Sequence, residues 1–152
     1  MTMENKQLAD KLREVAAALD MAIESRDADR VVSFFADDCE IEILRNQLVG
    51  KNGARKWFGW LCKNLRQIKF QPVVIMVEGN TLFEEFVVRA RLHSGIEVKS
   101  KQAEVLVFAK DKIKSLRIYF DRLDFADAVA RDPVSKAVVS RVIKKSLEGL
   151  TD

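Results

Sequence analysis

The sequence predicts one α+β domain, in which helices cover one face of a curved, mainly antiparallel sheet. Two observations carry this prediction. Apolar residues recur every three or four positions in most of the N-terminal part, and they alternate from about residue 67 to residue 120. A length of 152 residues fits a single domain with its own core. We take residues 1–152 as that domain, with a core region at 4–130 and an appended amphipathic helix at 133–149.

The N-terminal part of the chain predicts three helices and one strand. Residues 4–25 carry an apolar stripe at helical spacing, and Asp27 can cap a second, short helix that ends near "ADD" at 36–38. The alternating stretch at 39–44 predicts a strand. Residues 49–65 begin with turn residues and continue as a third helix.

Four further strands follow as a meander. Gly79-Asn80 and Ser94-Gly95 mark two of its turns, and Lys110 to Lys112 mark the third. Pro72 places the first of these strands at a sheet edge or beside a bulge. The strands are expected at 67–79, 80–92, 96–109 and 113–120.

A basic amphipathic helix ends the chain. Asp132 is placed to cap it, and Pro133 stands at its first position. Its apolar stripe includes Val134, Val138 and Val142. We expect this helix to pack on its own domain or on a dimer mate, with binding to a membrane surface or another partner as the alternative.

Composition excludes several classes of function. The net charge is +3 and the basic residues are dispersed, so no nucleic-acid partner is expected. No run is apolar and long enough for a membrane span or a secretion signal, which predicts a cytoplasmic protein. A single His and no Cys/His cluster argue against a metal site, and no Gly-rich nucleotide loop is present, so no cofactor is expected. Cys39 and Cys62 are expected to be free thiols.

Three stretches together resemble the NTF2-like superfamily: "AIESRDADRVVSFFADDCEIEI" at 22–43, "LVGKNGARKWF" at 48–58 and "KIKSLRIYFDRLDFADAV" at 112–129. The last stretch is similar to the closing strand and helix of the limonene epoxide hydrolase branch. The resemblance implies a cone-shaped, cystatin-like fold with a deep apolar pocket, often in a homodimer. Ketosteroid isomerases and SnoaL-like polyketide cyclases belong to the same superfamily, so the fold alone does not fix an activity.

The residues of this chain depart from the epoxide hydrolase pattern. Those enzymes use a Tyr, an Asn, an Arg and two Asp residues. The corresponding positions here hold Ile41, Ile43, Glu85, Val87 and Ile118. Epoxide hydrolase activity is therefore not expected.

The ketosteroid isomerase pattern is also incomplete. Its general base falls at Ile43 and its tyrosine at Leu19. Only its protonated carboxylic acid has an acidic counterpart, which is Glu104. The resemblance therefore leaves Glu104 as the leading candidate for chemistry.

Hairpin geometry suggests a partner for Glu104. If Ser94-Gly95 is a two-residue turn, Glu85 lies directly opposite Glu104, with Cβ atoms about 5 Å apart. Two carboxyl groups at that separation in an apolar cavity share a proton, and one acid and one base result. We therefore expect Glu104 and Glu85 to be the catalytic pair.

The same geometry predicts the pocket wall. A three-residue loop at Lys110 to Lys112 places Ile118 beside Glu104. Such a pocket suits a small hydrophobic molecule with one polar or carbonyl end. The predicted ligand-binding residues are Ile41, Ile43, Trp57, Val87, Arg89, Gln102, Leu106, Leu116, Ile118 and Phe120.

A second interpretation reverses the two faces of the strand at 80–92, so that the residues placed in the pocket above would point outward. Leu82, Phe86 and Val88 belong to a cleaner apolar row, which predicts that Glu85 and Arg89 face solvent or a dimer surface. The sequence leaves both orientations open. It predicts a SnoaL-like pocket protein with general acid/base proton transfer, and the alternative is a non-catalytic module for ligand binding, protein interaction or dimerisation.

Overall fold

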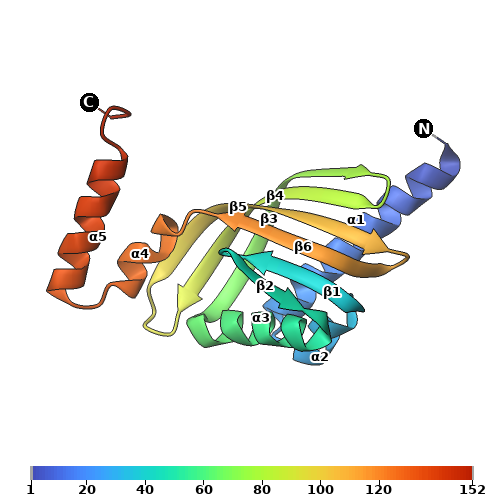
Figure 1. The fold of residues 1–152 in the computed structure, drawn as a ribbon, viewed down its shortest axis with the longest axis horizontal. Coiled ribbons are helices and arrows are strands. Elements are labelled where there is room, and N and C mark those ends of the chain that lie inside the picture. The colour runs from blue at the N-terminus through green and yellow to red at the C-terminus, as the bar shows by residue number, and fades with distance from the viewer. Residues whose placement is uncertain (1, 152) are drawn as a thin grey trace.

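Within residues 2–151, the computed structural model has five helices and one six-stranded sheet (Figure 1). The α+β fold class predicted from the sequence is confirmed. The helices are α1 (Met3–Glu24), α2 (Ala28–Ser33), α3 (Gly50–Asn64), α4 (Leu123–Val129) and α5 (Pro133–Ser146). The strands are β1 (Phe35–Ile43), β2 (Asn46–Val49), β3 (Leu65–Glu78), β4 (Thr81–Leu92), β5 (Glu97–Ala109) and β6 (Lys112–Phe120).

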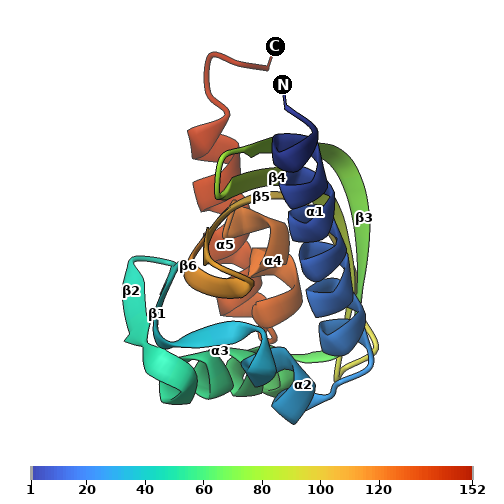
Figure 2. The same ribbon diagram turned by 90° about the vertical axis from the view of Figure 1, so that its right-hand side faces the viewer.

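The strands are arranged in the order β2-β1-β6-β5-β4-β3. Only β1 and β6 run parallel among these neighbours, and the other pairs are antiparallel. The sheet curves around the N-terminal helices, with α1 packed along β3 and α3 packed on β1 (Figure 2). This cone-like arrangement leaves an inner face between the sheet and the helices.

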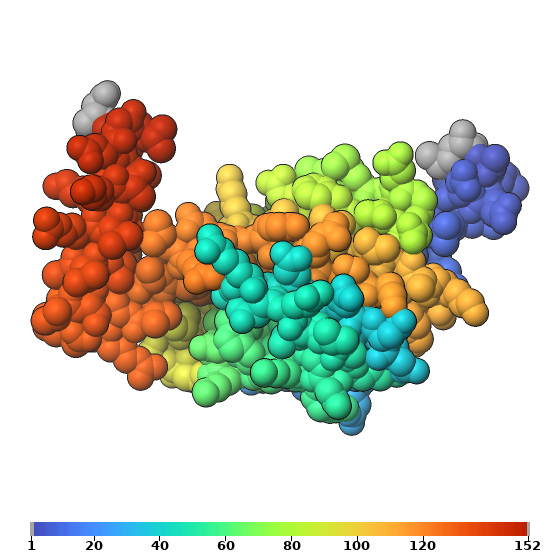
Figure 3. All heavy atoms as spheres, in the orientation of Figure 1, coloured from blue at the N-terminus to red at the C-terminus, as the bar shows by residue number. Residues whose placement is uncertain are grey.

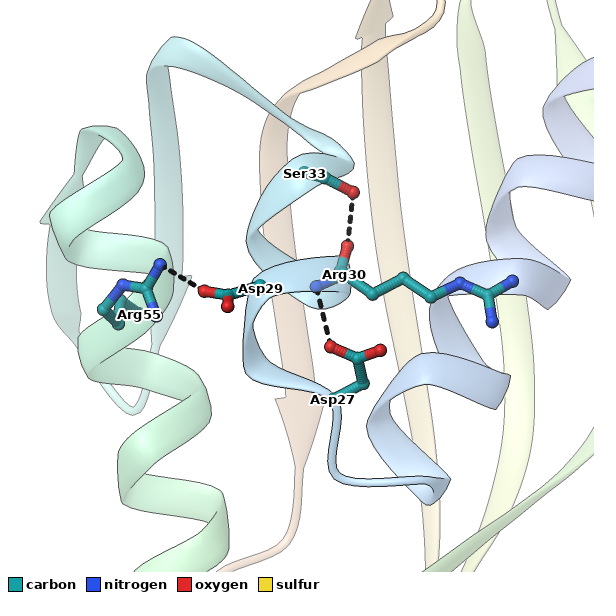
Figure 4. Close-up of polar contacts among 5 residues, drawn as sticks. All are labelled: Asp27, Asp29, Arg30, Ser33 and Arg55. Atoms are coloured by element: carbon teal, nitrogen blue, oxygen red, sulfur yellow. Dashed lines mark hydrogen bonds and ion pairs between the residues drawn. The ribbon is translucent and has the colours of Figure 1, made fainter.

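Side-chain hydrogen bonds fix α2 between the other helices (Figure 4). The carboxylate of Asp27 accepts from the backbone N–H of Arg30 at 3.0 Å, so the predicted cap is confirmed. The Ser33 hydroxyl donates to the carbonyl of Arg30 at 2.6 Å in the last turn. Arg55 of α3 donates to Asp29 at 2.9 Å and ties the two helices together.

The boundary between α2 and β1 lies earlier than predicted. Helix α2 ends at Ser33, and β1 begins at Phe35 rather than at residue 39. The N–H of Ile113 donates to the carbonyl of Phe34 at 2.9 Å, and Phe35 pairs with Ile113 of β6. Pairing with β6 therefore makes residues 35–38 part of a strand, although their local sequence pattern predicted the end of a helix.

Strand β2 is absent from the sequence prediction. It forms a hairpin with β1 across Leu44 and Arg45, whose φ angles are 51° and 64°. A two-residue turn with both φ angles positive normally contains Gly, Asn or Asp. Because neither residue gives that signal, the sequence did not reveal the turn.

The β4–β5 hairpin corrects the predicted carboxyl pair. The N–H of Leu92 donates to the carbonyl of Ile96 at 2.9 Å, which makes a three-residue loop closed by Gly95 at φ +92°. The register therefore moves by one residue relative to the two-residue turn that we predicted. Glu84 lies opposite Glu104, and Glu85 lies opposite Ala103. The predicted pairing of Glu85 with Glu104 is wrong.

The β5–β6 hairpin has a shorter turn than predicted but the predicted register near the site. Ala109 pairs with Lys112, so the loop has two residues. An irregularity between Val107 and Phe108 then shifts the register by one. As a result Ile118 pairs with Glu104, as the sequence predicted.

The edge strand and the final helix also follow their sequence signals. Strand β3 lies at the sheet edge, and its register shifts just after Pro72. Asp132 caps α5 and Pro133 begins it. No residue of α5 is buried, and the helix stands away from the sheet beside α4 (Figures 1 and 3). The expected packing of this helix on its own domain is therefore wrong beyond its contact with α4, and packing on a dimer mate stays a prediction.

Two further observations concern residues 2–151. Cys39 and Cys62 are free, as expected; Cys39 is buried and Cys62 is partly buried. None of the helices combines the length and the apolar character that crossing a membrane requires.

Candidate functional site: a cavity with buried carboxyl groups

A cavity of about 290 Å³ lies between the inner face of the sheet and the helices α1, α3 and α4. Its walls are mostly apolar and aromatic. The aromatic side chains are Trp57, Trp60, Phe70, Phe86, Phe120 and Phe125. Asp20, Glu104, Gln102, Asn64 and Arg122 are the polar or charged residues that line it.

The sheet register explains why an acid lies in this cavity. One cross-strand row on the inner face runs through Ile43, Ile118, Glu104, Glu84 and Ile75. Directly opposed residues have Cβ atoms about 5 Å apart, so Glu84 and Glu104 are close neighbours. Both are buried, with exposed fractions of 2% and 9%.

The adjacent row lies in the closed core beside the cavity. It consists of Ile41, Leu116, Leu106 and Leu82, and each of these side chains has an exposed fraction of 0%. These residues belong to the central hydrophobic core. The two glutamates therefore lie where the closed core ends and the cavity begins.

A third carboxyl group enters from α1. Burial first, and then the nearby charges of Glu84 and Glu24, raise the pKa of Asp20 from 3.8 to about 8. Its neighbours one helical turn away on the same face, Ala16 and Ile23, are buried. Asp20 thus titrates close to neutral pH.

Burial is also the largest cause of the raised pKa values of Glu84 and Glu104. The pKa of Glu104 is raised well above its ordinary value, first by burial and then by the charges of Asp20 and Glu84. Burial raises the pKa of Glu84 as well. Within residues 2–151, no basic group or hydrogen bond counteracts these shifts. The three groups therefore form an acidic cluster in which every pKa is raised, most strongly those of Asp20 and Glu104.

A hydrogen-bonded chain holds α4 over the cavity. The Ser100 hydroxyl, which is buried, donates to Asp124 of α4 at 2.7 Å. Gln102 donates to the Ser100 oxygen at 3.2 Å. Phe125 and Val129 of α4 line the cavity. The position of this short helix therefore determines how the cavity is covered.

The predicted site residues fall into three groups. Glu104, Ile43, Trp57, Gln102, Ile118 and Phe120 line the cavity. Ile41, Leu106 and Leu116 lie on the inner face but in the closed core beside it. Glu85, Val87 and Arg89 lie on the outer face of β4, because Glu84, Phe86 and Val88 take the inner positions.

Sequence reasoning missed Asp20 and Glu84. Glu84 stands in the middle of the apolar row that contains Leu82, Phe86 and Val88, so an acid on the inner face was visible in the pattern. Asp20 adjoins the apolar stripe of α1. Its entry into the cavity depends on how α1 packs on β3, which periodicity does not give.

Two negative observations define the chemistry further, both for residues 2–151. No group of three or more His, Cys, Asp or Glu side chains is placed to hold a metal ion. The buried Trp57 Nε1 is the one side-chain polar atom that is fully enclosed and lacks a hydrogen-bond partner. The donors and acceptors of the site are therefore carboxyl, amide, guanidinium and indole groups.

Sequence comparison identifies the family. The family model described as SnoaL-like domain matches residues 15–116, which is about two thirds of the chain. The chain belongs to the SnoaL-like domain family. No curated protein sequence matches it.

Solved structures with the same fold share little sequence with this SnoaL-like domain. An NTF2-like protein of unknown function from Burkholderia pseudomallei superposes with a TM-score of 0.73 at 13% identity, covering 80% of this chain and 98% of that one. A protein with a ketosteroid isomerase-like fold from Catenulispora acidiphila, in complex with trimethylamine, gives a TM-score of 0.69 at 14% identity, covering 74% of this chain and 89% of that one. A polyketide cyclase-like protein from Xanthomonas campestris gives 0.69 at 13%, covering 75% and 93%. The predicted superfamily is thus confirmed, and at these identities the likeness concerns the fold.

Proposed function

We propose that this SnoaL-like domain binds a small, mainly apolar ligand in the cavity and exchanges a proton with it through Glu104 and Asp20. The observation that carries the proposal is the presence of two carboxyl groups with raised pKa values in an otherwise apolar and aromatic cavity. Strongly shifted ionisable groups in a pocket are typical of functional sites.

The two carboxyl groups suit different parts of a proton transfer. Asp20, with a pKa of about 8, has both protonation states populated near neutral pH, so it can give or take a proton. The raised pKa of Glu104 favours its protonated form in the ligand-free protein, so it can donate a hydrogen bond or a proton to a ligand atom. Reactions of this class include isomerisation, cyclisation and dehydration.

The size of the cavity limits the ligand. Sites for drug-sized ligands have volumes of about 300–1,000 Å³, so a cavity of about 290 Å³ fits a compact molecule with one or two rings. The family match and the polyketide cyclase-like neighbour are consistent with a cyclic organic substrate.

A second candidate function is that of a non-catalytic module that dimerises through the outer face of the sheet. Val74, Met76 and Tyr119 on this face have exposed fractions of 40%, 57% and 52%. Ala103 and Glu85 lie between Tyr119 and Val74 in one cross-strand row. Exposed apolar side chains on one face of a sheet favour a protein interface.

A ligand screen tests the proposed function. Small lipophilic carbonyl compounds, amines and epoxides should include binders that raise the thermal unfolding temperature. Glu104→Gln should remove at least about 90% of any isomerase or cyclase activity found with a binder, since general acid/base groups contribute about 10²–10⁴-fold. Glu85→Gln is the matched control and should retain activity, because this residue lies on the outer face.

Two results would contradict the proposal. The first is the absence of any stabilising small molecule from all three classes. The second is full activity in the Glu104→Gln variant. Binding without turnover would favour the non-catalytic module.

A further inference from the structure

Within residues 2–151, no positive charge is paired with the acids of the cavity. Asp20, Glu84 and Glu104 come from α1, β4 and β5, and their charges raise one another's pKa values. Two further charged groups lie near them. Glu24 of α1 is engaged with Lys69 at 2.9 Å and with the N–H of Phe70. The positive charge of Lys69 is therefore matched by Glu24 and not by the three cavity acids.

Arg122 is the one basic residue among the described residues that line the cavity, and it is exposed. Its guanidinium donates to the carbonyl of Leu44 at 3.1 Å. It does not contribute to the pKa shifts of the three carboxyl groups. A bound ligand could therefore supply the positive charge that pairs with Asp20, Glu84 and Glu104.

Glu104 gives an independent indication of a ligand. It is nine-tenths buried and lines the cavity, and no hydrogen bond from residues 2–151 contributes to its pKa. Buried carboxyl groups normally have hydrogen-bond partners. The partner that would complete Glu104 therefore belongs inside the cavity.

The aromatic walls of the cavity also favour a positively charged ligand. Six aromatic side chains line the cavity, and two pairs pack edge to face: Phe70 with Phe86 at 5.7 Å and Phe120 with Phe125 at 5.6 Å between ring centroids. The faces of aromatic rings attract cations, and quaternary ammonium groups are commonly bound in cages of such rings. A site with acids on one side and aromatic rings around them complements an organic cation.

We propose that the ligand of this cavity is an organic cation, a small apolar molecule that carries a protonated or quaternary nitrogen. An inorganic cation is not favoured, because the carboxyl groups of residues 2–151 are not grouped closely enough to hold a metal ion. The inference rests on the proposed function and names the class of its ligand.

Cation binding also changes the protonation of the site. A carboxyl group that is protonated in the free protein releases its proton to solvent, and the resulting carboxylate pairs with the bound nitrogen. Asp20 and Glu104 thereby change from acids to bases. The ligand itself would thus activate the groups that take a proton from it.

Isothermal titration calorimetry with two probes tests the inference. Benzyltrimethylammonium is a permanent cation, and phenyl tert-butyl ketone is a neutral molecule of similar size. At about pH 8 the cation should bind at least about tenfold tighter than the ketone, because it gains from both carboxylates and rings. Its affinity should rise with pH by about tenfold or more per pH unit below the pKa of Asp20, because at least one proton is released on binding. Buffers with different ionisation enthalpies should report that release directly.

Single substitutions can distinguish a loss of cation recognition from a loss of folding, because a variant that still binds the ketone is folded. Glu104→Gln and Asp20→Asn should each weaken cation binding by at least about tenfold while ketone binding is retained. Glu85→Gln, on the outer face, should change neither. Tighter binding of the ketone than of the cation would overturn the inference and leave the proposed function intact. Failure of both probes to bind would overturn the inference, while the wider screen decides the proposed function separately.

Discussion

At the scale of single residues, Asp20, Glu84 and Glu104 have raised pKa values because burial disfavours the charged form of a carboxyl group. A folded protein avoids most of that cost by keeping the groups protonated. Hydrophobic residues at these positions would give a more stable core. The presence of three such acids at one place therefore supports a role in ligand binding or chemistry.

The raised pKa of Asp20 determines the direction of a pH effect on stability. In the unfolded chain Asp20 ionises near 3.8, and in the folded protein near 8. Between these values the folded state holds a proton that the unfolded state has released, so the free energy of unfolding should decrease as pH rises from about 4 to about 8. Urea unfolding at several pH values should show this decrease. Asp20→Asn should make the dependence shallower, and an identical slope in the variant would contradict the assignment.

Glu84 and Glu85 offer a matched pair of substitutions. Glu84→Gln removes a buried carboxyl group whose pKa burial raises, so at about pH 8 it should stabilise the protein by on the order of 1 kcal/mol. Glu85→Gln changes a partly exposed residue on the outer face and should stay within about 0.5 kcal/mol of the wild type. Urea unfolding of both variants measures the difference. The opposite order would show that the register places Glu85 inside.

At the scale of elements, turn chemistry decides which side chains reach the cavity. A difference of one residue in the loop before Ile96 exchanges Glu84 for Glu85 on the inner face. The apolar row of β4 contained the information needed to choose, since Phe86 and Val88 require the same face as Glu84. Periodicity was a better guide here than the assumed turn length, because burial of a whole strand face outweighs the preference of one turn.

Helix α4 should depend on a single buried hydrogen bond. Ser100→Ala removes the 2.7 Å bond to Asp124, so we expect a loss of about 1 kcal/mol in stability and faster amide exchange in residues 123–129. Hydrogen exchange measured by mass spectrometry can follow this segment. Ser115→Ala, at a partly exposed position of β6, serves as the control. Unchanged exchange in α4 would mean that packing of Phe125 holds the helix without this bond.

At the scale of the whole molecule, the fold was more predictable than the site. Long periodic segments gave α1, α3 and the meander, since each buries a face that its own sequence marks. The cavity is formed by residues from α1, α3, α4 and the sheet together. Asp20 joins Glu104 through helix packing, although 84 positions separate them in the sequence. Such a contact leaves no local signal.

The assembly of the molecule can be tested through its outer sheet face. We expect a homodimer with a mass about twice 17.3 kDa. Met76→Glu should give a monomer, because it places a charge among exposed apolar side chains of β3 and β6. Val138→Glu on α5 tests the other exposed apolar surface and should leave the dimer intact. Sedimentation or light scattering measures the mass, and a wild-type mass of 17.3 kDa would contradict this expectation.

The central claim is that the cavity holds protonated carboxyl groups at neutral pH. Carbon-13 NMR of the side-chain carboxyl groups, titrated from about pH 3 to about pH 10, measures it most directly. We expect Asp20 to titrate near pH 8 and Glu104 to stay protonated well above its ordinary range. Asp20→Asn and Glu104→Gln assign the two signals. Titration of both groups near pH 4 would contradict the account, because it would show them hydrated and ionised rather than enclosed in the cavity.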